Sequence, residues 1–341
     1  MNHFSLFLKG LVESEKGNTD SSITTIENLI KNGFSQKEIY YQLASAQRKV
    51  GNYEGAFTSL VKAEMMSEND DSFLSKIIVL KGTLFFLSGN YEKAKGEYET
   101  SLKLSKQSGN TVEEIKSLAN LGIIKDMYGE VDDARQDFLT GIEMAKEIEN
   151  AELLAFLYSE LGVSFTYTNN LIEARQNYEQ SYEMYRSLHN NERLSYLSAN
   201  IGSLFLQISN YKSALNSYTE GLSFAGDNKL GKILNLTGIA DVYSNESNYS
   251  KALEYYDKAK EVADSIKDIP SIIKIDEGIG ALYFNINRPA MALESLIKAD
   301  SLATQHQMLF EQIKLYSNIG TVLTSMDSLE QAEIYFEKGL N

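Results

Sequence analysis

The sequence of 341 residues contains no cysteine, no tryptophan and only two prolines. Without cysteine the chain can form neither a disulfide nor a thiolate metal site, and the redox compartment is left open. Proline interrupts helices because it lacks an N–H donor, so its near absence favours long, continuous helices. Hydrophobic residues make up 43% of the chain, which is typical of a folded protein.

Long apolar runs and an excess of positive charge are also missing. No run approaches the length of about eighteen apolar residues that a membrane helix needs. The stretch "FSLFLKGLV" at residues 4–12 is interrupted by Lys9 and follows no basic segment, which argues against a signal peptide. The net charge is −15 at pH 7, whereas nucleic-acid binding needs a basic face. We therefore expect no nucleic-acid partner, no direct membrane insertion, and a cytoplasmic location, or a periplasmic one if a signal peptide has been removed.

What the sequence does contain is a repeated pattern. A small residue is followed twelve positions later by alanine, and four positions beyond that by an aromatic residue or leucine. The register advances by 38 or 40 residues from one copy to the next, which is the length of two helices with their turns. The pairs are Ala44 with Ala56, Gly82 with Ala94, Gly122 with Ala134, Gly162 with Ala174, Gly202 with Ala214, Ala240 with Ala252, Gly280 with Ala292, and Gly320 with Ala332.

Residues 111–148 show how one unit forms two helices. "TVEEIKSLANLGIIKDMYG" offers Thr111 as an N-cap, and "VDDARQDFLTGIEMAKEI" starts with acidic residues, as helix N-termini prefer. At about 100° per residue, positions −4, −1, 0 and +3 from the small residue share one stripe, where glycine lets the partner helix approach closely. Lys81, Lys125 and Asp276 break this apolar stripe and predict looser or misaligned packing.

The segments "GTLFFLSGNYEKAKGEYETSL" (82–102) and "IGSLFLQISNYKSALNSYTEGL" (201–222) carry the pattern most clearly. They resemble the tetratricopeptide repeat (TPR), and the period of about 40 residues is similar to the longer repeats of kinesin light chains and bacterial TPR regulators. The resemblance implies an all-α fold, a right-handed α-solenoid of helix hairpins. We expect residues 1–341 to form a single superhelix, with a degenerate first repeat or cap over 1–35 and eight repeats over 36–341.

The resemblance also implies that the first helix of each hairpin lines the concave side of the solenoid. Offsets of −6, −3, −2, +1 and +5 from the small residue should then point into this groove. The expected peptide- or partner-binding residues are Lys116, Asn120, Phe156, Ser159, Tyr167, Tyr196, Asn200, Ser203 and Asn318.

Two interpretations of these residues stay open. Asn120, Asn200 and Asn318 share one offset, and a row of amides, each a donor and an acceptor, could pair with the backbone of an extended peptide. The same amides could be solvated or bond a neighbouring repeat. Aromatic residues dominate binding hot spots, but Phe156, Tyr167 and Tyr196 could also pack between adjacent first helices.

Catalytic and cofactor motifs are absent from the sequence. There is no P-loop, no dinucleotide glycine pattern after a strand, and no G-x-S-x-G elbow. The three histidines have no ligand set: His189 and His306 fall in turns between repeats, far apart in a stacked array. We therefore expect no enzymatic activity, no cofactor and no metal.

Two functions compete at this stage. The first is a protein-interaction scaffold that holds a peptide or a partner segment in the groove. The second is the sensor or oligomerisation part of a larger bacterial signalling or transcription-regulatory protein, with its output domain outside this chain. The last predicted helix, "AEIYFEKGLN", has no polar capping helix after it, so this uncapped end could pair with a second copy.

Overall fold

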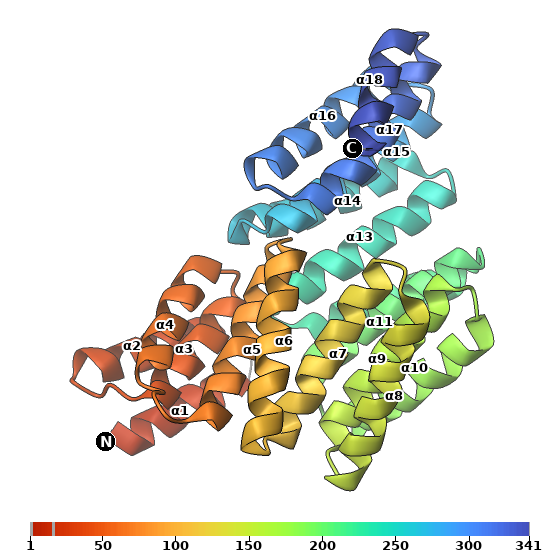
Figure 1. Cartoon of the computed structure of the whole chain (residues 1–341). Coiled ribbons are helices and arrows are strands. Elements are labelled where there is room, and N and C mark those ends of the chain that lie inside the picture. The colour runs from red at the N-terminus through yellow and green to blue at the C-terminus, as the bar shows by residue number, and fades with distance from the viewer. Residues whose placement is uncertain (1–2, 16–17, 341) are drawn as a thin grey trace.

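The computed structural model describes residues 3–15 and 18–340, and these residues form eighteen α-helices and no strand (Figure 1). Successive helices pack side by side as nine hairpins along one curved stack. The expected all-α solenoid of about eight repeats plus one N-terminal hairpin is thus confirmed. The helices are α1 (His3–Glu15), α2 (Thr19–Lys31), α3 (Lys37–Lys49), α4 (Tyr53–Met65), α5 (Asp71–Leu87), α6 (Tyr91–Ser108), α7 (Thr111–Met127), α8 (Val131–Glu147), α9 (Ala151–Tyr167), α10 (Leu171–Ser187), α11 (Asn191–Gln207), α12 (Tyr211–Ala225), α13 (Lys229–Asn245), α14 (Tyr249–Ile266), α15 (Ile269–Asn285), α16 (Pro289–Gln305), α17 (Leu309–Ser325) and α18 (Leu329–Leu340).

The ends of the helices follow from short sequence signals. Asparagine is the N-cap residue of ten of the described helices, and in eight of them its side chain accepts a hydrogen bond from the backbone N–H three residues later. Thr111, the expected N-cap of α7, is instead its first helical residue, and Asn110 is the cap. Within hairpins, the residue before the cap turns the chain with a positive φ, as at Gly89.

The repeated small residue gives the hairpins their close packing. A Cβ atom built on Gly82, Gly162 or Gly202 would lie 2.6–2.7 Å from the ring of Tyr98, Tyr178 or Tyr218 respectively. Each of these rings stands four residues after the repeated alanine, and the alanines are almost fully buried. The ring of one helix therefore rests on the backbone of the other, which explains why the two signals recur twelve and sixteen residues apart.

The three residues that break the apolar stripe form ion pairs in the structure. The Lys81 ammonium lies 3.2 Å from Glu64 and 3.7 Å from Glu97. Lys125 pairs with Asp137 at 2.6 Å. The buried carboxylate of Asp276 pairs with Lys260. Each position is therefore a polar link between helices rather than the loose contact that the sequence predicts, because a buried charge needs a partner of opposite sign.

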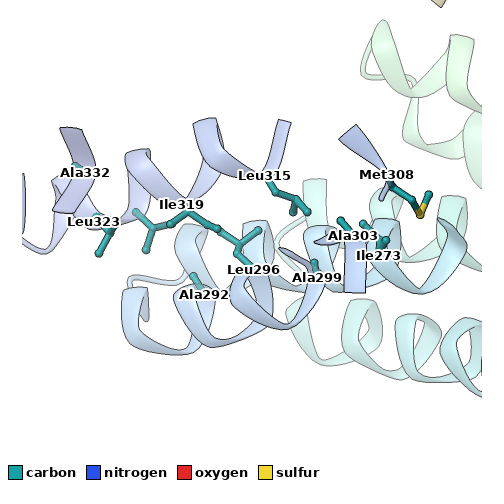
Figure 2. Packing of buried hydrophobic residues seen from close by; sticks show 11 residues of the cluster. Ile273, Ala292, Leu296, Ala299, Ala303, Met308, Leu315, Ile319, Leu323 and Ala332 are labelled. Carbon is teal, nitrogen blue, oxygen red and sulfur yellow. The ribbon is translucent and has the colours of Figure 1, made fainter. Parts of the chain in front are cut away.

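The core runs along the whole stack as a series of apolar clusters between the helices. Figure 2 shows the last one, in which Leu296, Leu315 and Ile319 fill the space between α16 and α17. At the other end, Ile26 of α2 is buried in one cluster with Ile39 and Leu43 of α3. The first hairpin thus packs onto the second, and its assignment as a degenerate repeat or a cap stays a prediction. No helix among the described residues is long and apolar enough to cross a membrane.

Candidate ligand groove

The first helices of four successive hairpins, α9, α11, α13 and α15, border one pocket of about 330 Å³, which we call the groove pocket. Two second helices, α10 and α12, reach it with one tyrosine each. The groove pocket is lined by Val163, Thr166, Tyr167, Tyr178, Ala199, Asn200, Ser203, Leu206, Tyr218, Ile233, Leu234, Thr237, Gly238, Asp241, Ser271 and Lys274.

The side chains reach the groove pocket because of their offset from the repeated small residue. Asn200 and Ser203 flank Gly202 at −2 and +1, and Tyr167 follows Gly162 at +5. These are the offsets that the sequence assigns to the groove face. Helical periodicity places them opposite the packing stripe, so successive hairpins present them to the same hollow.

Tyr178 and Tyr218 come from second helices and pass between the first ones. A Cβ atom on Gly202 would lie 2.7 Å from the Tyr218 ring, and one on Gly238 would lie 2.1 Å from it. The buried ring of Tyr218 is therefore held between two glycines of successive first helices. Gly238 occupies the offset at which three other repeats carry asparagine, because only glycine leaves room for the ring.

Two ionisable side chains, Asp241 and Lys274, line the groove pocket besides its tyrosines. The Asp241 carboxylate accepts a hydrogen bond from the Tyr256 hydroxyl. Burial raises the pKa of Asp241, while the Tyr256 hydrogen bond and the Lys274 charge oppose that rise. The Lys274 side chain is exposed in the groove, and no described residue forms an ion pair with it. The groove pocket thus presents an ammonium group without an ion-pair partner and a half-buried carboxylate.

Three of the nine predicted binding residues meet in the groove pocket. The Tyr167 side chain is 66% exposed at its edge, and Ser203 is exposed beside it. Asn200 is half-buried, and within the described part of the chain no hydrogen bond reaches its side-chain amide. An exposed ring, a hydroxyl and an unpaired amide on neighbouring helices form a surface that can hold an extended peptide.

The other six predicted residues lie outside the groove pocket, and four of them have partners within the solenoid. Lys116 pairs with Glu113 at 2.8 Å, and the guanidinium of Arg193 lies 5.1 Å from the centre of the Phe156 ring. The amide of Asn228, in the next hairpin, donates to the Tyr196 hydroxyl at 2.7 Å, and the Asn318 amide donates to Glu277 at 2.7 Å. Ser159 is buried. Asn120 is half-buried, and its amide has no partner among the residues that the structure describes.

The asparagine row therefore divides. Asn318 bonds a neighbouring repeat, as one of the two interpretations proposed, whereas Asn120 and Asn200 keep free amides. Likewise Phe156 and Tyr196 contact neighbouring hairpins, and Tyr167 alone of the predicted aromatic residues is exposed. Ligand binding by any of these side chains stays a prediction.

The sequence interpretation missed several residues of the groove pocket. Leu234, Thr237 and Asp241 occupy offsets −6, −3 and +1 from Ala240, and Lys274 stands at −6 from Gly280. The same offsets, applied to these two repeats, would have found them. Tyr178 and Tyr218 could not be found in this way, because they belong to second helices and reach the hollow only through the glycine gaps.

A second group of acids lies next to the groove pocket, on α7 and α9. Burial raises the pKa of Glu160 from 4.5 to about 7; Arg193 opposes this rise, and Asp126 adds to it. Burial also raises the pKa of Asp126 from 3.8 to about 6, against the hydrogen bond that the Ser164 hydroxyl donates and the charge of Arg135. Within the described ranges, no group of three histidine, aspartate or glutamate residues is arranged to hold a metal ion.

Comparison with known proteins agrees with the fold. The family model "Tetratricopeptide repeat" matches residues 37–70, 235–265 and 313–341. A search of curated proteins found no match. Among solved structures, a Rap protein complexed with the competence and sporulation factor is similar, with a TM-score of 0.69 at 13% identity over 99% of this chain and 97% of that one.

Two further structures are similar over most of their length. The Rap conjugation gene regulator of plasmid pLS20, in complex with the Phr* peptide, gives a TM-score of 0.65 at 13% identity over 98% of this chain and 93% of that one. Aspartyl phosphate phosphatase F from Bacillus subtilis gives 0.58 at 10% identity over 99% and 93%. At such identities the likeness shows the fold alone. The three matched segments carry tetratricopeptide repeats, and the helix hairpins and these similar folds agree with a solenoid of the tetratricopeptide-repeat type.

Proposed function

We propose that the chain is a non-enzymatic scaffold that binds a peptide, or an extended segment of a partner protein, along its concave groove. The observation that carries this proposal is the groove pocket itself: four successive first helices present an exposed ring, a free amide and an unpaired ammonium to one hollow. Extended peptides need backbone hydrogen bonds and anchoring side-chain pockets at repeat spacing, and this surface offers both.

The similar structures support the proposal by analogy. One is described as a complex with a competence and sporulation factor, and another as a complex with a peptide. A third is named a phosphatase, but an identity of 10% carries no activity to this chain. We keep the cytoplasmic location as part of the proposal.

The proposal is tested with a peptide array probed by the purified chain, followed by titration of the peptide that binds most strongly. Replacing Asn120→Ala together with Asn200→Ala should weaken that binding by about thirtyfold, because each amide that loses a backbone hydrogen bond costs about 1 kcal/mol. Helicity and melting temperature should hardly change, since neither amide bonds another described residue.

Asn216→Ala is the matched control, because Asn216 is exposed on the second helix α12, away from the groove. It should leave the affinity unchanged. Equal affinity of the double variant and the control would remove the amides from the binding surface.

A second proposal is that the chain associates with itself and serves as the sensor or oligomerisation part of a larger protein. The outer face of the last hairpin favours it: the Leu309 side chain is 71% exposed, Ile313 is 52% and Ile334 is 52%. Ile273 and Ile233, which precede Ile313 by one and two repeats, are each 2% exposed under the next hairpin. Self-association would cover the equivalent apolar surface on this face.

A further inference from the structure

The solenoid closes on itself through contacts between hairpins that are distant in the sequence. The Tyr91 hydroxyl, at the start of α6, donates to the Glu311 carboxylate on α17 at 2.8 Å, across 220 residues. The ring of Phe310 meets those of Tyr91 and Tyr128 edge-on, with centroids 5.7 Å and 6.3 Å apart. In Figure 1 the C-terminal hairpins accordingly lie beside the upper ends of α5 and α6.

Two glycines let other parts of the N-terminal and C-terminal hairpins approach closely. Gly51, in the turn between α3 and α4, faces Ile266 at the end of α14: a Cβ atom on Gly51 would lie 2.9 Å from the Ile266 Cβ and 3.0 Å from its carbonyl oxygen. A Cβ atom on Gly89 would lie 2.3 Å from the methyl carbon of Met308, whose side chain is 1% exposed.

Gly129 occupies the same turn one repeat later than Gly89, with φ +83, and has nothing within 4 Å of its Cβ position. The turn geometry is therefore common to all three glycines, whereas the close approach is peculiar to the first two. Gly51, Gly89, Tyr91 and Tyr128 thus pack on Ile266, Met308, Phe310 and Glu311, a contact that we call the latch.

An ion pair strengthens the closure on one side. The Lys49 ammonium, at the end of α3, lies 3.3 Å from the Glu192 carboxylate near the start of α11. Elsewhere in the stack, helices contact those of their own and neighbouring hairpins. The latch and this ion pair are therefore links between successive turns of the superhelix.

The groove pocket lies in the arc that the latch spans. Its lining runs from Val163 to Lys274, between Tyr128 on one side of the latch and Met308 on the other. In a solenoid, small rotations between neighbouring repeats add up over the stack. A contact that ties the two ends of an arc fixes the sum of those rotations, and with it the width of the groove.

We infer that the latch gates the groove pocket by limiting the width of the groove, so that a bulky ligand enters more readily when the latch opens; this inference rests on the proposed function, in which the pocket receives the ligand. By linkage, whatever separates the two sides of the latch changes access to the pocket, and a ligand that needs a wider groove favours the unlatched state.

The test measures access to the groove pocket without any ligand. Because the chain has no cysteine, Ser203→Cys places a single thiol in the pocket. Its alkylation rate is measured with a polyethylene glycol maleimide, and with iodoacetamide to correct for the reactivity of the thiol itself. The latch variant adds Gly51→Asn and Gly89→Asn, because asparagine accepts the positive φ, as it does at Asn169 and Asn287, while its side chain collides with Ile266 and Met308.

The ratio of bulky to small reagent rates should rise about fivefold or more in the latch variant. Gly129→Asn, in the same turn with open space around it, should leave the ratio unchanged. Equal ratios in the latch variant and this control would overturn the gate. If the asparagine variant fails to fold, Tyr91→Phe with Phe310→Leu removes the hydrogen bond and ring contacts without adding bulk, and the same comparison decides. Because this experiment uses no ligand, a negative result would contradict the gate without contradicting the proposed peptide binding, which the peptide array tests separately.

Discussion

Glu160 shows how a single side chain in this solenoid responds to its position. It stands at the offset where Asn120 and Asn200 stand in neighbouring repeats, but it carries an ionisable group into the same half-buried layer. Water is largely excluded there, which disfavours the charged carboxylate, and the nearby Asp126 disfavours it further. Arg193 compensates for only part of this effect. The residue therefore makes the stability of the fold depend on pH.

We expect Glu160→Gln to stabilise the protein at pH 8 by about 2 kcal/mol and to change little near pH 3, where the carboxyl group is protonated in both folded and unfolded chains. Between pH 4.5 and about 7 the folded state keeps a proton that the unfolded chain has lost, so wild-type stability falls as pH rises through this window. Urea unfolding at several pH values measures the free energy of unfolding of the wild type and the variant.

The Glu160→Gln variant should show a smaller decrease in stability with rising pH than the wild type. It should keep the part that Asp126 contributes in the same direction, between its unfolded pKa of 3.8 and its folded pKa of about 6. A variant whose stability runs parallel to that of the wild type from pH 5 to pH 8 would mean that Glu160 is already ionised in the folded state.

At the scale of the hairpin, the effect of replacing a glycine depends on the atoms that surround it. Gly238 of α13 lies against the buried ring of Tyr218, which is held on its other side by Gly202. Gly96 of α6 is exposed and has nothing within 4 Å of its Cβ position. Both glycines are helical, so they differ in surroundings rather than in backbone conformation.

Gly238→Ala should therefore destabilise the protein by about 1–3 kcal/mol, because the added methyl group overlaps a ring that has no room to move. Gly96→Ala should stabilise it by about 0.5–1 kcal/mol through helix propensity. Thermal and urea denaturation of the two variants give the comparison. Equal effects of the same sign would show that the Tyr218 ring can shift after all.

The repeat pattern predicted the hairpins and part of the groove, for a physical reason. Every hairpin packs its two helices in the same way, so a ring in one helix requires a small residue in the other at a fixed spacing. The opposite face of the first helix then remains for the groove. The repeat pattern did not predict the ion pairs of Lys81, Lys125 and Asp276. Their partners lie on other helices, at positions that the local period does not mark.

On the scale of the whole molecule, the last described hairpin differs from the interior of the stack. Every inner hairpin is covered on both sides, whereas the outer face of α17 and α18 exposes Leu309, Ile313 and Ile334. Apolar patches of this kind favour association. The net charge of −15 opposes it, and salt weakens that repulsion.

We expect the chain to form dimers at micromolar or higher concentration, more readily at high salt, and Ile313→Lys with Ile334→Lys to abolish them. Sedimentation velocity over a range of concentrations measures the association. Ile172→Lys, which replaces a side chain 73% exposed on α10, is the matched control and should leave it unchanged. A wild-type chain that stays monomeric at every concentration would contradict the proposed self-association.

The sequence by itself determined the helix hairpins, their close packing through glycine, alanine and tyrosine, and the offsets of the groove face, because all of these depend on contacts within one repeat or between neighbours. It could not show that Phe156, Tyr196 and Asn318 contact neighbouring elements while Tyr167, Asn200 and Ser203 share a pocket. Nor could it show the latch between Tyr91 and Glu311. Those outcomes depend on small rotations accumulated over many repeats, and only the tertiary structure decides where the sum of these rotations brings distant hairpins together.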